Sequence, residues 1–148
     1  LSGKYTLIQA DSARKYAHHT IRVADKIADT EYQGKAWQLL AEVDANSGRL
    51  DSLDISYLRS KSYLEDCTTE ACQSINIDLE LIYGYSFNDR GQHQRAVKII
   101  KPLLSFAYIS ETQRCLTTIH LATCYLELGD LDEAFRYVFF HLVLNQSY

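Results

Sequence analysis

Five histidines and four cysteines are the side chains of this sequence best suited to binding a metal ion. His18 and His19 are adjacent, so on a helix their rings diverge by about 100° and cannot chelate one ion together. His93, His120 and His141 stand in separate segments of the chain. We therefore interpret the histidines as structural, and we expect neither a metal site nor a cofactor.

The cysteines indicate two different roles. Cys115 and Cys124 lie on opposite faces of one expected helix, which favours a role as small, buried apolar residues. Cys67 and Cys72 are too far apart to be bridged inside a continuous helix, but a bend at residues 66–69 would bring their sulfur atoms together. The spacing leaves this disulfide open. If the disulfide forms, it favours a periplasmic location, and otherwise a cytoplasmic location stays open.

No pattern in the sequence is typical of catalysis. The sequence lacks a phosphate-binding loop, a nucleophile elbow and a metalloprotease helix motif. Asp130, Asp132 and Glu133 stand where a helix is expected to begin, and the helix dipole favours carboxylates there. We therefore do not expect this segment to be an enzyme.

The composition is typical of one all-helical domain. Apolar residues make up 47% of the 148 residues against 23% charged residues, which excludes a disordered chain. One proline and six glycines argue against a β fold with many turns. A net charge of −4 argues against binding of nucleic acid, and the lack of a long apolar run argues against contact with a membrane. The sequence contains no methionine, so we expect it to be part of a longer protein.

A helix–glycine–helix pattern occurs three times. Each copy has an apolar stripe at helical spacing, a glycine stop at Gly48, Gly91 or Gly129, and a second apolar stripe. Small residues alternate with large ones in these stripes, as closely crossing helices require. The small residues are Ala41, Gly84, Ala96, Ala122 and Ala134, and the large ones include Phe87, Ile100, Tyr125 and Val138. The predicted single domain, residues 1–148, contains a partial unit at 1–29 and helix pairs at about 31–66, 69–106 and 111–145.

Capping patterns predict where the helices begin. Thr30, Ser110 and Asp130 are each followed three residues later by Gln or Glu, which is the spacing of a capping box. These boxes place helix starts near residues 31, 111 and 131. Pro102 has no amide proton to donate to the carbonyl of Lys98, so we expect the helix there to kink or to end early.

The repeated pattern resembles the tetratricopeptide repeat, whose signature is W-x2-L-G-x2-Y, then Ala and Ala-x3-Phe, at a period of 34 residues. The matching residues are Trp37, Leu40, Gly84, Tyr125, Ala96 and Ala134. The sequence departs from the family at Asp44, which replaces the aromatic residue, and it lacks the closing proline in every copy. The resemblance covers about residues 10–145 and implies an all-α, right-handed superhelix (α-solenoid) of antiparallel helix pairs.

The resemblance also implies a binding surface. In this family the first helix of each unit lines a concave groove, which usually holds an extended peptide or a helix. The corresponding residues here are Gln38, Glu42, Asn46, Leu81, Tyr85, Asn88, Ile119, Thr123 and Leu126. Chaperone-binding members hold a C-terminal carboxylate with Lys and Asn, and the matching positions here are Gln38 and Glu42, which argues against that subtype.

Units of about 40 residues are similar to those of bacterial signalling proteins, in which such arrays precede an output domain. That domain is often a diguanylate cyclase (GGDEF) or a histidine kinase. We therefore expect a protein-interaction or sensor segment of a larger bacterial signalling protein, which binds a protein or peptide. A free-standing adaptor or secretion-type chaperone is the alternative, and a repeat domain regulated by a small molecule is a third hypothesis.

The last expected helix, residues 134–144, is apolar around nearly its whole circumference. By the family pattern, Ala134, Val138 and His141 would face the helix's own unit, and the other apolar residues would need a different cover. We predict that this cover is a further helical unit or a second copy of the chain, which would make a homodimer. The contact residues would be Phe139, Phe140, Leu142 and Val143.

Overall fold

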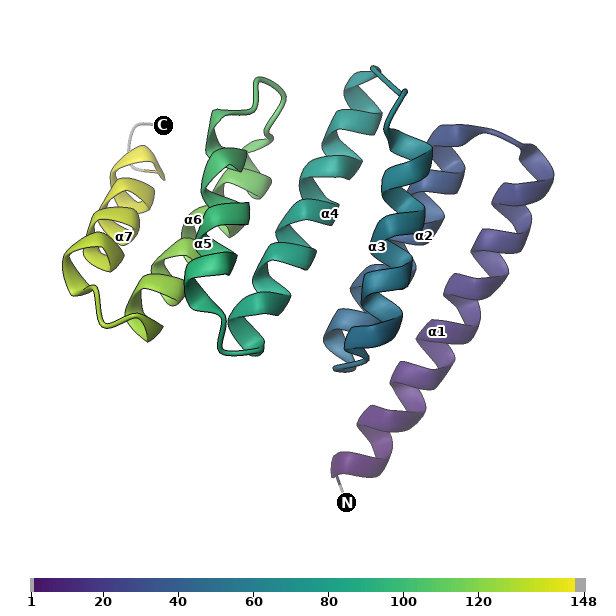
Figure 1. Ribbon diagram of the computed structural model, residues 1–148, viewed down its shortest axis with the longest axis horizontal. Coiled ribbons are helices and arrows are strands. Elements are labelled where there is room, and N and C mark those ends of the chain that lie inside the picture. Colours follow the sequence, from purple (N-terminus) through teal and green to yellow (C-terminus); the bar gives the residue numbers. More distant parts are fainter. Residues whose placement is uncertain (1, 146–148) are drawn as a thin grey trace. The chain divides into compact units, whose positions relative to one another are not determined.

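Helices form all the regular structure in the described part of the chain. A computed structural model describes the backbone of residues 2–145 and the side chains of residues 9–140 and of Val143 (Figure 1). Within that part there are seven α-helices, one 3-10 helix and no strand, so the all-α prediction is confirmed. The elements are α1 (Ser2–Ile27), α2 (Thr30–Asn46), α3 (Leu50–Leu64), α4 (Glu70–Asp89), α5 (His93–Ile100), η1 (Lys101–Ser105), α6 (Glu111–Glu127) and α7 (Leu131–Asn145).

The chain divides into two compact units, and the boundary falls inside α4. Unit 1 is Leu1–Tyr83 and contains α1, α2, α3 and most of α4. Unit 2 is Gly84–Tyr148 and contains the end of α4 together with α5, η1, α6 and α7.

Three glycines end helices in the same way. Gly48, Gly91 and Gly129 have φ angles of 68°, 73° and 77°, a left-handed conformation that glycine adopts without steric cost. In each turn, the amide after the glycine donates to a carbonyl five residues earlier in the chain. These bonds run from Arg49 to Asp44, from Gln92 to Phe87 and from Asp130 to Tyr125, over 2.8, 2.8 and 2.9 Å. The three predicted glycine stops are confirmed, and the shared bonding explains why the pattern recurs.

Of the three predicted capping boxes, one is confirmed in full and one in half. Ser110 and Gln113 form a complete capping box at the start of α6, and the Asp130 carboxylate accepts from the amide of Glu133 at 3.1 Å. The box at Thr30 is wrong, because Asp29 caps α2 one residue earlier and accepts from the amides of two residues in its first turn. An aspartate oxygen is at least as good an N-cap acceptor as a threonine hydroxyl, and it lies one position closer to the preceding helix.

Pro102 ends α5 early, as predicted. The helix stops at Ile100, and the chain continues as the 3-10 helix η1. Proline lacks the amide proton that an α-helix needs at this point, but it fits the first positions of a new helical turn. Leu103 of η1 is only 2% exposed, so the tighter turn places an apolar side chain back in the core.

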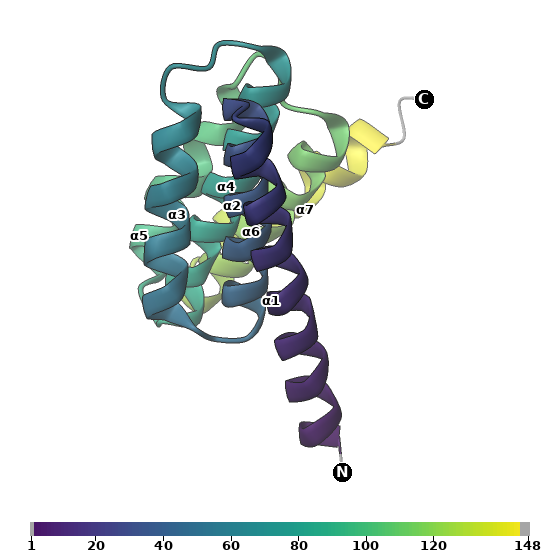
Figure 2. The same ribbon diagram turned by 90° about the vertical axis from the view of Figure 1, so that its right-hand side faces the viewer.

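Unit 1 has two apolar clusters. Ala17, Ile21 and Ala24 on α1 face two residues of α2, with Trp37 packed at the edge. A second cluster joins α2, α3 and the first part of α4, and it consists of Ala41, Leu53, Leu64, Cys72, Ile75 and Leu79. The N-terminal end of α1 projects beyond the ends of α2 and α3 (Figure 2). Because α2 contributes to both clusters, it connects α1 to the rest of the unit.

Unit 2 depends on small residues at close helix crossings. A Cβ atom added to Gly84 would lie 2.7 Å from Cγ1 of Ile100, so the α4 backbone approaches α5 closely. Ala96, Ala122 and Ala134 are 0, 5 and 2% exposed, which confirms that these small residues face the core. The larger buried side chains of the unit are Phe87, Ile100, Leu103, Leu121 and Cys124. Among the large residues that the sequence predicts for these stripes, Phe87 and Ile100 are buried, Tyr125 is half-buried and Val138 is exposed.

Candidate functional site

Three of the nine predicted groove residues are buried and cannot meet a partner. Gln38, Leu81 and Asn88 are 2, 5 and 8% exposed. The Gln38 carbonyl oxygen accepts from the Lys35 ammonium at 2.7 Å, and the Asn88 carbonyl oxygen lies 2.7 Å from Nδ1 of His93. The groove prediction is wrong for these three, because each side chain is buried in the protein. The two side-chain amides are hydrogen-bonded there, and the leucine is removed from water.

The predicted groove residues of unit 2 that remain accessible lie mainly on α6. Ile119 and Leu126 are 48 and 53% exposed, and Thr123 lies between them with its hydroxyl donating to the Ile119 carbonyl at 3.0 Å. Leu116, which sequence reasoning missed, is 42% exposed one turn before Ile119. The sequence indicates this position, because a residue three positions before Ile119 lies next to it on the helix surface. These four residues form an exposed face of α6, opposite the buried Leu121.

The accessible groove residues of unit 1 are polar. Glu42 and Asn46 are exposed one turn apart on α2. They offer a carboxylate and an amide but no apolar surface, so the α6 face and these two residues differ in what they can bind.

Tyr85 lies near the α6 face, where its ring stacks on His120. The two ring centroids are 3.9 Å apart and the rings are tilted by 38°. Burial lowers the pKa of His120, and Asp89 opposes that shift only in part. Nδ1 of His120 is buried without a hydrogen-bond partner among the described residues. A neutral imidazole tolerates that environment better than an imidazolium, so this ring acts as an aromatic partner for Tyr85.

Cys124 is a buried thiol, one turn along α6 from His120. It is 0% exposed, and burial, helped by the charge of Asp89, raises its pKa to about 11. A thiol with so high a pKa is not a nucleophile at neutral pH, because the thiolate is the reactive form. Cys115 is half-buried and is not part of a disulfide. Among the described residues, no three His, Cys, Asp or Glu side chains come together in a way that could hold a metal ion.

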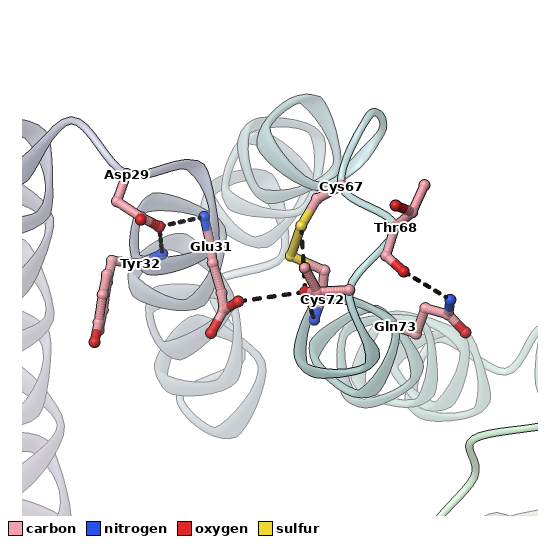
Figure 3. The surroundings of a disulfide bond; sticks show 8 residues. Asp29, Glu31, Tyr32, Cys67, Thr68, Cys72 and Gln73 are labelled. Carbon is pink, nitrogen blue, oxygen red and sulfur yellow. Dashed lines mark hydrogen bonds between the residues drawn. A yellow bond between two sulfur atoms is a disulfide. The ribbon is translucent and has the colours of Figure 1, made fainter.

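A disulfide closes the connection between α3 and α4. Sγ of Cys67 and Sγ of Cys72 are bonded at 2.05 Å (Figure 3). The sequence spacing left this disulfide open, and the structure contains it. Thr69 lies inside the closed loop, where its hydroxyl accepts from the amide of Cys72 at 3.1 Å and caps α4. The same hydroxyl donates to the Glu31 carboxylate at 3.3 Å, which ties the loop to the first turn of α2. The loop is thus held by both a covalent bond and hydrogen bonds within unit 1.

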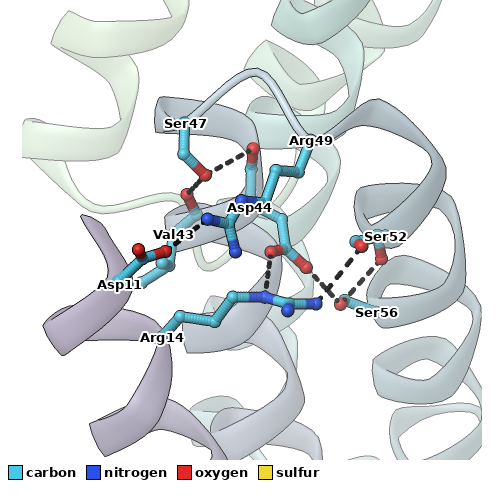
Figure 4. Close-up of polar contacts among 8 residues, drawn as sticks. All are labelled: Asp11, Arg14, Val43, Asp44, Ser47, Arg49, Ser52 and Ser56. Atoms are coloured by element: carbon cyan, nitrogen blue, oxygen red, sulfur yellow. Dashed lines mark hydrogen bonds and ion pairs between the residues drawn. The ribbon is translucent and has the colours of Figure 1, made fainter. Parts of the chain in front are cut away.

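A buried carboxylate links three helices of unit 1. Asp44 on α2 is 0% exposed and accepts from Nε of Arg14 on α1 at 3.0 Å and from the Ser56 hydroxyl on α3 at 3.1 Å (Figure 4). A second nitrogen of Arg14 donates to the Ser52 hydroxyl at 3.2 Å. Sequence reasoning noted Asp44 only as a departure from the repeat pattern. The basic residue that satisfies it lies thirty positions away, and no local pattern identifies such a partner.

The α7 helix exposes more apolar surface than its neighbours can cover. Leu131, Phe135, Val138 and Phe139 are 57, 70, 44 and 68% exposed and follow helical spacing, and we call them the α7 stripe. Val138 was predicted to face its own unit together with Ala134, and its exposure shows that this was wrong. Among the predicted contact residues, Phe139, Phe140 and Val143 are exposed, whereas the side chain of Leu142 lies outside the described residues, as does that of His141.

Comparison with known proteins adds no relative. No protein-family model, no curated protein and no solved structure matches this chain. In residues 2–145, no helix combines the length and the apolar character needed to cross a bilayer.

Proposed function

We propose that this chain is a tetratricopeptide-like, right-handed superhelix that serves as a protein-interaction or sensor segment of a larger bacterial signalling protein. The three helix pairs with the same glycine turn support the repeat. The disulfide supports an oxidising compartment such as the periplasm. The partner in this proposal is a protein or a peptide.

The observation that carries the proposal is the exposed face of α6. Leu116, Ile119 and Leu126 lie on one side of a helix whose other side is buried, and each remains about half exposed. Contiguous apolar surface of this kind is costly in water and is typical of sites where a partner helix or peptide binds. Tyr85 and Thr123 beside it supply hydroxyl groups that can orient such a partner.

A library of random peptides displayed on phage tests this proposal. Peptides selected on the wild-type protein should lose binding by about tenfold or more to an Ile119→Glu, Leu126→Glu variant, because two buried apolar contacts become charged. The matched control is Ile55→Glu, Leu58→Glu on α3, whose side chains are 60 and 65% exposed. Selected peptides that bind both variants as well as the wild type would refute the α6 face as the binding site.

We further propose that the α7 stripe packs on another helical unit of the parent protein or, in its absence, on a second copy of the chain. Phe135 and Phe139 lie one turn apart and are the most exposed phenylalanines of α7. Sedimentation at micromolar concentration should show a dimer that the Phe135→Glu, Phe139→Glu variant abolishes. A wild-type protein that stays monomeric and whose solubility does not respond to these charges would contradict the proposal.

A further inference from the structure

A shallow hollow lies along α1, on the face that turns away from α2. It has a volume of about 390 Å³ and is lined by Ser12, Lys15, Tyr16, His19 and Arg22. These residues follow helical spacing on the side of α1 opposite Ala17, Ile21 and Ala24, which pack against α2. The lining contains two permanent cations and no carboxylate.

The charged residues of α1 differ in their partners. The carboxylates of α1 are engaged toward α2 and α3, since Asp11 pairs with Arg49 and Asp25 accepts from the Gln33 amide at 3.2 Å. Arg14 is likewise engaged with Asp44. Lys15 and Arg22, in contrast, have no ion-pair partner within the described part of the chain. The outer face of α1 therefore carries two cations that are available to a partner, on a chain whose net charge is −4.

An apolar line runs beside these cations. Tyr16, Val23 and Ile27 are 73, 42 and 56% exposed, and their spacing of seven and four residues keeps them on one side of the helix. Lys15 and Arg22 are seven residues apart, which is about 10 Å along the helix axis. The face is thus a strip with a charged edge about two turns long and an apolar edge about three turns long.

We propose that this strip of α1 binds an acidic amphipathic peptide segment. Its carboxylates would pair with Lys15 and Arg22, and its apolar side chains would cover Tyr16, Val23 and Ile27. The hollow receives a protruding side chain, which a flat bilayer surface does not supply. The lining residues form one row along a single helix and do not surround a ligand, which favours an elongated partner over a small anion. The site belongs to unit 1 and is independent of the α6 face.

The probe for this site is a fluorescein-labelled helical peptide with two repeats of Glu-Leu-Ala-Glu-Glu-Leu-Ala, measured by fluorescence anisotropy with the full chain. We expect it to bind about tenfold more tightly than the same peptide with Gln in place of Glu, because surface ion pairs contribute modestly and add up. Raising the salt concentration should weaken this preference, since exposed charges are screened. The Lys15→Glu, Arg22→Glu variant should bind about tenfold more weakly and should accept a peptide with Lys in place of Glu.

Three controls make the result decisive. Lys15→Arg with Arg22→Lys should keep binding, and so should Lys98→Glu with Arg136→Glu, which reverses two exposed charges in unit 2. Circular dichroism should show the same helix content for every variant, since all four side chains point to water. Equal weakening by the unit 2 variant would overturn the proposal. So would binding that depends on Lys15 and Arg22 but occurs only with inorganic phosphate or with vesicles containing phosphatidylglycerol.

Discussion

Unit 1 and unit 2 share the same helix–glycine–helix turns but are stabilised differently. In unit 1, a disulfide, the Arg14–Asp44 ion pair and the Lys61–Glu80 ion pair connect different helices or the loops between them. Close helix crossings occur in both units, at Gly34 in unit 1 and at Gly84 in unit 2, but in unit 2 α6 and α7 also keep apolar faces exposed. The two units therefore differ in what connects their helices and in how much apolar surface they leave exposed on α6 and α7.

The contrast follows from what each unit places at equivalent positions. In each glycine turn, one residue accepts the bond from the amide that follows the glycine. This residue is Asp44 in unit 1, and Phe87 and Tyr125 in unit 2. A buried carboxylate requires a polar or charged partner, whereas the phenyl ring of Phe87 requires only apolar neighbours. Trp37, the single tryptophan, packs against the α1–α2 cluster of unit 1, so its fluorescence reports on that unit, whereas circular dichroism reports on both units.

The largest effect is expected from Asp44→Ala. This change should lower the free energy of unfolding by about 2–3 kcal/mol, because it leaves the Arg14 guanidinium without its buried partner. Urea unfolding followed by Trp37 fluorescence measures the loss. Asp11→Ala is the control, since its pair with Arg49 is exposed and should contribute less than about 1 kcal/mol. Equal effects of the two changes would show that the buried link does not distinguish unit 1.

Ala134→Leu tests the packing of unit 2. We expect a loss of about 2 kcal/mol, because a residue that is 2% exposed at a close helix crossing has no space for three more carbons. The loss should appear first in circular dichroism, before Trp37 fluorescence changes. Phe135→Leu, at a side chain that is 70% exposed, should change stability by less than about 0.5 kcal/mol. Coincident shifts in both signals would mean that the units unfold together.

Removing the disulfide should weaken unit 1 by a smaller amount. A Cys67→Ser, Cys72→Ala variant should lose roughly 1–2 kcal/mol, since a short covalent loop restricts the unfolded chain less than a long one. Trp37 fluorescence in urea gives the value, and reduction of the wild type should reproduce it. Mass spectrometry of the unreduced protein should find these two cysteines linked. Four free thiols in protein made in an oxidising compartment would contradict both the bond and the periplasmic hypothesis.

The smallest effect concerns pH and His120 in unit 2. Because burial lowers its pKa below the ordinary value of 6.5, the unfolded chain binds a proton there at a higher pH than the folded protein does. Stability from this group is therefore fully present above pH 6.5 and is lost as the pH falls below it. Circular dichroism melts between pH 7 and 5 should show this decline, and His120→Gln should reduce it. His18→Gln, at an exposed position, should leave the decline unchanged.

Local sequence patterns were sufficient for the helices and their ends. The glycine turns, the cap at Ser110 and the early end of α5 at Pro102 depend on contacts within a few residues, so spacing alone predicts them. The one wrong cap, at Thr30, shows the limit of this approach. Two neighbouring residues can both accept the same amide protons, and the sequence does not rank them.

Tertiary structure decided which residues are accessible. The groove prediction placed Gln38, Leu81 and Asn88 on a surface, but all three are buried in the fold, whereas Val138 is exposed. The pairing of Arg14 with Asp44 and the closure of Cys67 on Cys72 likewise depend on how separate helices meet. The sequence by itself thus determined the helical repeat, because hydrogen bonds and caps are local. Burial, ion pairs between helices and exposed apolar faces were decided by the fold, because they arise between residues far apart in the chain.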